Sequence, residues 1–279
     1  MDSTFLTAIF ALSAAVAWGS GDFTGGVVAR RIGVIHTMFL SYAVALIILI
    51  IVALLRLEPF PAPVDLMWGA LAGLFGMAGF GFLLRGFATG RMGIVAPVSA
   101  VLATAIPVIF SIFSEGLPRP LQLIGFGLAL ISIWLLSRPE KLGGNPAGLG
   151  MALLAGLGFG GFFTALDQIS EDAIFWPIAA GRLAACAAMV LFTLGTHGAL
   201  LPKSSPLGPL ILLGVLDVAG NLFFLLAVQT GRLDVAAVLA SLYPALTALL
   251  AWWIAREHMA LLQVIGLAQA IVAIVLITL

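Results

Sequence analysis

The hydrophobic residues of the chain form long runs, separated by short segments with charges, prolines or glycines. A hydrocarbon core about 30 Å thick needs roughly 20 apolar residues in helical conformation, so these runs predict ten membrane-spanning helices. Five lie before the longest polar segment, residues 138–146, and five lie after it. The predicted spans are residues 5–27, 33–55, 66–88, 92–114 and 120–136, then 147–165, 174–194, 207–230, 235–254 and 259–279.

The second half of the sequence repeats the first half. Thr-Gly-Arg at residues 89–91 occurs again at residues 230–232, an offset of 141. The same offset, without gaps, matches further residues of the two halves: Gly73, Gly79, Phe82 and Gln122 with Gly214, Gly220, Phe223 and Gln263. The chain is therefore predicted to contain one five-helix unit twice, over residues 1–141 and 142–279.

The odd number of helices in each unit determines how the two units would lie in the membrane. A second copy that follows five spans begins on the opposite side of the bilayer. The predicted fold class is thus an all-α membrane protein with ten transmembrane helices in two inverted five-helix repeats. Inverted repeats are typical of secondary transporters, in which a central site opens to either side in turn.

The composition agrees with a membrane protein and argues against other classes. Hydrophobic residues make up 62% of the chain, charged residues 9%, and the mean hydropathy is +1.22, whereas about a quarter of a soluble domain is charged. The 12 basic and 12 acidic side chains cancel, which argues against nucleic acid as a partner. The expected partners are the lipid bilayer and a small-molecule substrate, and the oligomeric state is left open, a homo-oligomer included.

Motifs of enzyme chemistry are missing from the sequence. It has no phosphate-binding Gly-Lys-Ser/Thr loop, no HExxH and no GxSxG. The histidines are far apart and Cys186 is the only cysteine, so no metal-ligand spacing occurs. We therefore expect no enzymatic activity, no cofactor and no metal. The first apolar run is long enough to span and lacks a cleavage site, so we expect it to be retained in a multi-pass protein of an inner, or plasma, membrane.

Asp217 is the strongest candidate for a functional residue. It lies near the middle of a predicted span, where an ionisable side chain costs about 2.5 to 3.5 kcal/mol on insertion scales, and Asn221 follows one turn later on the same face. Asp217 is predicted to bind a proton that drives transport, or to contact a cationic or amino group of the substrate. The alternative is a structural ion pair with Arg85 or Arg182.

Other polar residues within the spans are further candidates for substrate binding. Asp22 is a second candidate for proton coupling, and Trp18 lies one turn before it, so an indole and a carboxylate would be available to a small amphipathic ligand. Asp22 could instead be a hydrated acid at a helix end. Ser99 and Tyr243 make the fourth and ninth spans more polar than lipid favours, so we expect both helices to face a cavity.

Glycines and prolines within the spans mark candidate hinges. Small residues allow close helix packing and bending, and prolines remove backbone hydrogen bonds at membrane depth. Close packing alone explains the glycines equally well. The predicted hinge residues are Gly19, Gly21, Pro97, Pro107, Gly160 and Pro244.

Several features together resemble one known family. A Thr-Gly-Arg turn precedes a proline-containing fourth or ninth span, a glutamate follows that span (Glu115 and Glu257), and Gln-x-x-Gly opens the next one. Over its whole length the chain is similar to the EamA-like branch of the drug/metabolite transporter superfamily. The resemblance implies a secondary transporter with a cavity built from the first, third, fourth, sixth, eighth and ninth helices. It also implies cytoplasmic termini, whereas the basic residues of the loops favour termini outside.

We therefore predict a secondary active transporter that exports small organic metabolites, with amino acids or their analogues as the first expectation. The expected mechanism is alternating access coupled to protons. One alternative is multidrug efflux of hydrophobic organic cations, which Asp22 and Asp217 beside aromatic residues would suit. The other alternative is a membrane scaffold or receptor that transports nothing.

Overall fold

The computed structural model describes residues 3–89, 92–136, 149–196, 201–202, 206–254 and 261–278. The described residues form eleven helices and contain no strand. The helices of the first half are α1 (Ser3–Ile32), α2 (Val34–Leu55), α3 (Pro63–Thr89), α4 (Met92–Glu115) and α5 (Pro120–Leu136). Those of the second half are α6 (Leu149–Asp167), α7 (Phe175–Gly195), α8 (Leu207–Thr230), α9 (Leu233–Ala240), α10 (Tyr243–Trp253) and α11 (Leu261–Thr278).

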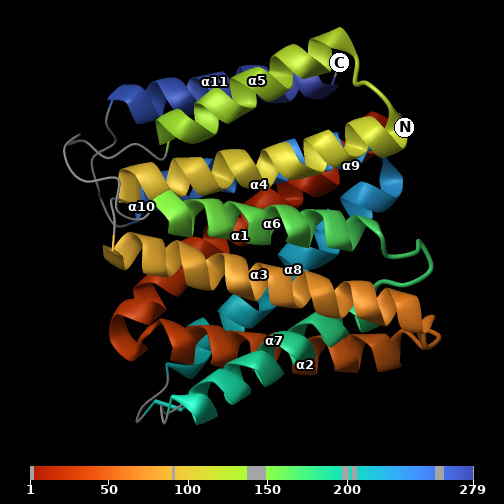
Figure 1. The fold of residues 1–279 in the computed structure, drawn as a ribbon, viewed down its shortest axis with the longest axis vertical. Helices are drawn as coiled ribbons and strands as arrows, with labels where there is room; N and C mark the ends of the chain where they lie inside the picture. Colours follow the sequence, from red (N-terminus) through yellow and green to blue (C-terminus); the bar gives the residue numbers. More distant parts are fainter. Residues whose placement is uncertain are drawn as a thin grey trace.

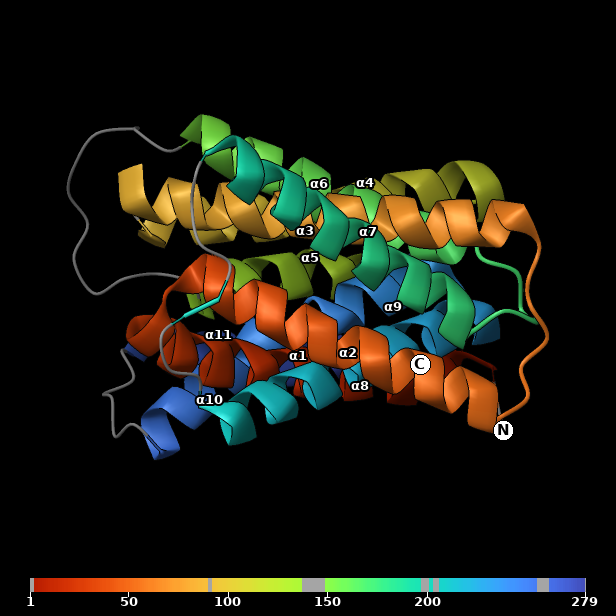
Figure 2. The ribbon, with the colours of Figure 1, turned by 90° about the horizontal axis from the view of Figure 1, so that it is seen from below.

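The long helices lie side by side along one common direction, and both termini lie toward the same end of the molecule (Figures 1 and 2). Among the described residues, seven helices are long and apolar enough to cross a membrane. Helices suit that environment because they satisfy their backbone hydrogen bonds internally, where lipid offers no partner. The chain is therefore an all-helical, multi-pass membrane protein. The predicted division at residue 141 falls outside the described residues.

Each main helix contact between the two halves has a counterpart in which the roles of the halves are interchanged. Helix α1 packs against α8, and α3 packs against α6; α4 packs on α6, as α9 and α10 pack on α1. The offset of 141 relates α1 to α6 and α3 to α8, so each of these contacts has a counterpart with the halves interchanged. Helices α5 and α11 form a pair of their own (Figure 1). The core of the molecule is thus built where the two halves meet.

Glycines set the shortest distances between helices of different halves. A Cβ atom at Gly73 of α3 would collide with the backbone of Gly181 on α7, and one at Gly69 would collide with Pro177. Backbones in such close contact compensate for the weak hydrophobic driving force between helices in lipid. The third and seventh helices therefore cross with no room for a larger residue.

The ninth span differs from the prediction of one continuous helix over residues 235–254. It is divided into α9 and α10, with Ser241 and Leu242 between them. Pro244 stands in the first turn of α10, where its missing N–H group does no harm, and the N–H of Ala245 donates to the carbonyl of Leu242 at 2.9 Å. The prediction of one helix was wrong because a proline near mid-span starts a new helix here.

Candidate functional site

An ion pair between α7 and α8 forms the centre of the candidate site. The Nε of Arg182 lies 2.6 Å from Oδ2 of Asp217, and its Nη2 donates to Oδ1 at 2.8 Å. Two parallel hydrogen bonds of this kind are the strongest geometry for a guanidinium and a carboxylate. The side chains are only 5% and 17% exposed. Of the two partners that the sequence offered Asp217, Arg182 is therefore the one that binds it.

Two further polar side chains hold this pair in place. Asn221, buried one turn after Asp217, donates from Nδ2 to the Asp217 carbonyl at 2.6 Å and to its Oδ1 at 3.3 Å. The guanidinium carbon of Arg182 lies 4.5 Å from the centre of the Tyr42 ring of α2. A cation over an aromatic face is attracted by about 0.5 to 2 kcal/mol. The pair is thus fixed from three helices.

Asp22 lies within electrostatic range of Tyr42 and of Tyr243. Tyr42 in turn lies within electrostatic range of Arg182 and Asp217. Asp22 is exposed, although α1 packs against α8, α9 and α10. We call these groups the charged cluster: Asp22, Tyr42, Arg182, Asp217, Asn221 and Tyr243.

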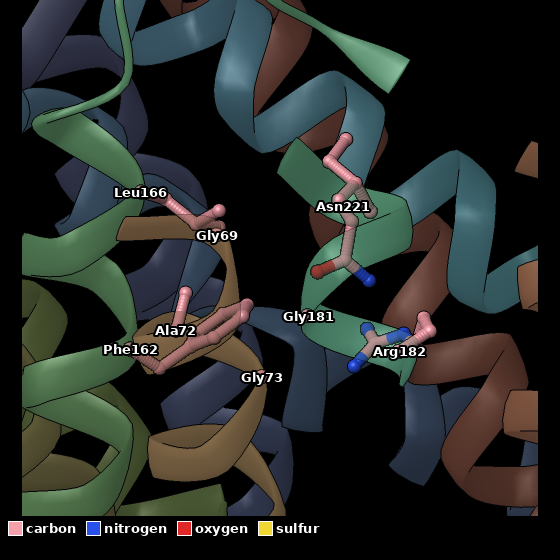
Figure 3. Close-up of a pocket in the computed structure, with 9 residues that line it drawn as sticks. Gly69, Ala72, Gly73, Phe162, Leu166, Gly181, Arg182 and Asn221 are labelled. Atoms are coloured by element: carbon pink, nitrogen blue, oxygen red, sulfur yellow. The ribbon is translucent and has the colours of Figure 1, made fainter. Parts of the chain in front are cut away.

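A small cavity lies next to the cluster (Figure 3). Arg182 and Asn221 point toward it from one side, and Phe162 and Leu166 of α6 approach it from the other. Glycines of α3 and α7, together with Ala72 and Ile178, complete the lining. Its volume is about 10 Å³, near the least that one water molecule requires. In this conformation the cavity is therefore far too small for a metabolite.

Trp18 belongs to an aromatic cluster rather than to an open ligand surface. The centroid of its indole lies 5.9 Å from the ring centroid of Phe162, 5.8 Å from that of Phe163 and 5.7 Å from that of Phe224. Gly220, which has no side chain, leaves room for the indole against α8. The distances are those of favourable aromatic pairs. Phe162 also lines the small cavity, so this aromatic cluster forms one wall of the site. A role of Trp18 in substrate binding stays a prediction.

The remaining predicted residues are distributed over several helices. Ser99 is buried on α4 where that helix crosses α6 at Gly156, away from the ion pair in sequence and in helix contact. Among the predicted hinges, Pro244 lies beside the break between α9 and α10. The others stand in uninterrupted helices, with the side chain of Pro97 outside the described residues: Gly19 and Gly21 in α1, Pro97 and Pro107 in α4, and Gly160 in α6.

Tyr42 and Phe162 belong to the site but were not selected from the sequence. Tyr42 is one of only two tyrosines in the chain, and its position in the most apolar span was the available signal. Phe162 is one of 19 phenylalanines and carries no such signal. Arg182 was recognised as a possible partner of Asp217, and its place beside the cavity follows from packing.

Comparison with known proteins agrees with this architecture. The chain matches the EamA-like transporter family twice, over residues 5–138 and 146–279. In a solved crystal structure, a chain with 18% identical residues has the same fold, with a TM-score of 0.82 and 98% of each chain covered. The curated proteins contain no match to this sequence.

The architecture therefore defines a polytopic helical membrane protein made of two similar halves with a charged site between helices. More specifically, because the two matches cover nearly all of the sequence, the chain belongs to the EamA-like transporter family.

Proposed function

We propose that this protein is a secondary active transporter that exports a small organic metabolite through the charged cluster by alternating access. The observation that carries the proposal is the Arg182–Asp217 pair, which joins α7 to the middle of α8 and lies beside a cavity. Ionisable groups at that depth are costly and mark substrate or ion pathways. The proposed setting is the inner, or plasma, membrane.

The two halves would form inverted repeats around this site. Each half supplies five spans when α9 and α10 are counted together, and the exchange of α1–α8 with α3–α6 contacts fits a pseudo-two-fold axis in the membrane plane. The break between α9 and α10 fits the same mechanism, since discontinuous helices line the central sites of transporters. Rocking of one half against the other would then open the site to each side in turn.

Amino acids or their analogues are the first proposed substrates. Arg182 offers a guanidinium to a carboxylate, and Asp22 offers a carboxyl group to an ammonium, so the cluster presents both charges of a zwitterion. Hydrophobic organic cations are the second candidate. The observation that favours them is that Asp217 is already paired, which leaves the exposed Asp22, near Tyr42 and Tyr243, to hold a cation.

Proton coupling is proposed for the carboxyl groups of Asp217 and Asp22. Protonation of Asp217 would release Arg182 from its partner and leave the guanidinium available to a substrate anion. Release of the proton would restore the pair at 2.6 Å and displace that anion. The pair thus offers a physical means to make proton binding and substrate binding depend on each other.

Flux into liposomes of purified protein tests this proposal. We expect a pH gradient to drive uptake of a zwitterionic amino acid or an organic cation. Asp217→Asn and Asp22→Asn should each reduce the initial rate at least about tenfold, because one charge-assisted contact contributes about 1.5 to 3 kcal/mol. Asp172→Asn, in the exposed loop after α6, is the matched control. Cargo flux that keeps its rate and its pH dependence in both variants would contradict the proposed roles.

A binding measurement can precede the flux assay. A ligand at about 100 times its dissociation constant adds roughly 2.7 kcal/mol of stability, so the melting temperature of the protein in detergent should rise with the correct chemical class. Screening amino acids, nucleosides, sugars and organic cations at two pH values separates the two candidate cargoes. A protein that neither binds nor moves any of them would instead fit the scaffold alternative.

A further inference from the structure

The end of the molecule that holds both termini carries a set of polar contacts between the two repeats. They involve the segments between α2 and α3, between α4 and α5, between α6 and α7, and between α8 and α9. Each contact joins a residue of the first repeat to a residue of the second. We call this set the latch, and its principal side chains are Glu58, Asp65, Glu115 and Arg232.

Arg232 and Glu115 cap each other's helices. The Nη2 of Arg232 donates to the Gly116 carbonyl at 2.7 Å, and Nη1 donates to the Glu115 carbonyl at 3.2 Å, at the C-terminus of α4. In return, Oε1 of Glu115 accepts the N–H of Leu233 at 3.1 Å, at the N-terminus of α9. A cation at a helix C-terminus and an anion at an N-terminus both stabilise the helix dipole. The two repeats thus satisfy each other's unpaired helix ends.

Asp234 fixes the guanidinium that makes these contacts. It is fully buried, and its Oδ2 lies 2.8 Å from Nη2 of Arg232 while Oδ1 accepts the Val235 N–H at 2.7 Å. Hydrogen bonding to Asp234 raises the pKa of Arg232 above its ordinary value, so the guanidinium stays charged at every physiological pH. Arg232 is therefore held in the orientation that reaches α4.

Glu58 makes an equivalent contact at the N-terminus of α7. Its carboxylate accepts the N–H groups of Ile174 at 2.6 Å, Phe175 at 3.0 Å and Trp176 at 3.2 Å. The indole N–H of Trp176 donates to the Glu58 carbonyl at 3.2 Å. Nearby, Oδ1 of Asp65 accepts the N–H of Ser170 at 2.9 Å. The α2–α3 loop and the first turn of α3 thus bind the α6–α7 loop and the first turn of α7 at several points.

Three of these acids, Glu58, Asp65 and Asp234, have no acidic counterpart in the other repeat, whereas Arg232 corresponds to Arg91. At the offset of 141, Glu58 corresponds to Ala199, Asp65 to Pro206 and Asp234 to Gly93. If both repeats carried the same polar residues, the contacts between them could form equally well at either end of the molecule. Because these three carboxylates exist in one copy only, the residues at the corresponding positions of the other repeat have no carboxylate to offer to a helix N-terminus.

The latch and the charged cluster share two helices. Helix α7 begins at the residues that Glu58 binds and carries Arg182 about two turns later. Helix α8 carries Asp217 and ends at Thr230, two residues before Arg232. Along these helices the small cavity lies between the latch and the Arg182–Asp217 pair, since its lining includes Ala72, Ile178 and Asn221. A movement that separates the repeats at the latch would therefore enlarge this cavity and reach the ion pair.

We propose that the latch is the gate on the side of the termini and that its unduplicated acids favour the conformation closed on that side. This proposal rests on the proposed function. Substrate transfer through that side requires the contacts of Arg232 and Glu58 with the other repeat to break and then to form again.

Cysteine accessibility tests the gate without any knowledge of the cargo. Cys186 is replaced by alanine, and Ala72, which is 1% exposed and lines the small cavity, is replaced by cysteine. A water-soluble maleimide then measures how often this position opens to water. Arg232→Ala and Glu58→Gln should each raise the labelling rate about tenfold or more, in proportion to the population of the open state.

Matched controls are available on the same end of the molecule. Arg119→Ala and Glu171→Gln remove the same charges from exposed positions and should leave the labelling rate unchanged. Glu58→Gln decides the outcome if Arg232→Ala fails to fold, as judged by its melting temperature. An unchanged labelling rate in the folded variants would overturn the gate. Absence of flux in the parent protein would instead overturn the proposed function, and the labelling result would stand.

Discussion

Removing one charge of the Arg182–Asp217 pair should destabilise the protein more than removing both. Asp217→Asn leaves the guanidinium of Arg182, which is 5% exposed, without its counter-charge. Breaking a buried pair on one side typically costs about 3 to 5 kcal/mol, whereas replacing both partners by neutral groups is often close to neutral. The Asp217 side chain is 17% exposed, so partial hydration favours the lower end of that range, about 3 kcal/mol.

A double-mutant cycle measures this directly. The proteins compared are the parent, Asp217→Asn, Arg182→Met and the variant with both changes, and the measurement is the free energy of unfolding in detergent. At roughly 2 to 4 °C per kcal/mol, Asp217→Asn should lower the melting temperature by about 10 °C, and the second change should restore part of it. Arg56→Met, in the exposed loop after α2, should change stability by less than about 0.5 kcal/mol.

The result that would refute the reasoning is additivity. If the double variant loses the sum of the two single losses to within about 0.5 kcal/mol, the two groups do not interact energetically. The bidentate geometry would then contribute nothing to stability, and the proposed dependence of proton binding on substrate binding would lose its physical basis.

Three further predictions test the packing and the site. Gly73→Ala should destabilise the protein by about 1 to 3 kcal/mol, because the added methyl group collides with the backbone of α7. Gly127→Ala is the control, since a methyl group at Gly127 would meet open space, and it should not destabilise the protein. Thermal unfolding of the two variants measures the difference. Tyr42→Ala should lower the melting temperature by an amount corresponding to about 0.5 to 2 kcal/mol, because it removes the ring below Arg182, while Tyr42→Phe should retain most of the parent's stability. Ser132→Ala removes a 2.6 Å hydrogen bond between α5 and α11 and should lower the free energy of unfolding by about 0.6 to 1.7 kcal/mol.

The duplication and the membrane-spanning runs could be derived from the sequence alone. Both are local or periodic properties, because the lipid imposes a minimum length on each apolar helix and a gene duplication preserves spacing. The depth of Asp217 was equally visible, since it depends only on its position within a span. The family match over residues 5–138 and 146–279 confirms the resemblance that these features suggested.

Only the tertiary structure decided which charged groups meet. Asp217 had two possible arginine partners, 35 and 132 residues away, and spacing along the chain does not distinguish them. Helix packing does so, because the close contact of α3 with α7 and of α2 with α7 brings Arg182 to α8 and Tyr42 beneath it. The break in the ninth span likewise depends on whether a proline kinks a helix or starts a new one, which is settled by the neighbours of α9 and α10.

The latch is the clearest case of a feature beyond sequence reasoning. Thr-Gly-Arg was recognised as a repeated motif, and its arginine was assigned no partner. In the fold, Arg232 meets Glu115 across 117 residues of chain, and Glu58 meets an α7 N-terminus that lies equally far away in sequence. The sequence determines which segments are apolar enough to span a membrane, since that follows from local hydrophobicity. The packing of the two halves decides which helix ends provide hydrogen-bond partners for each other.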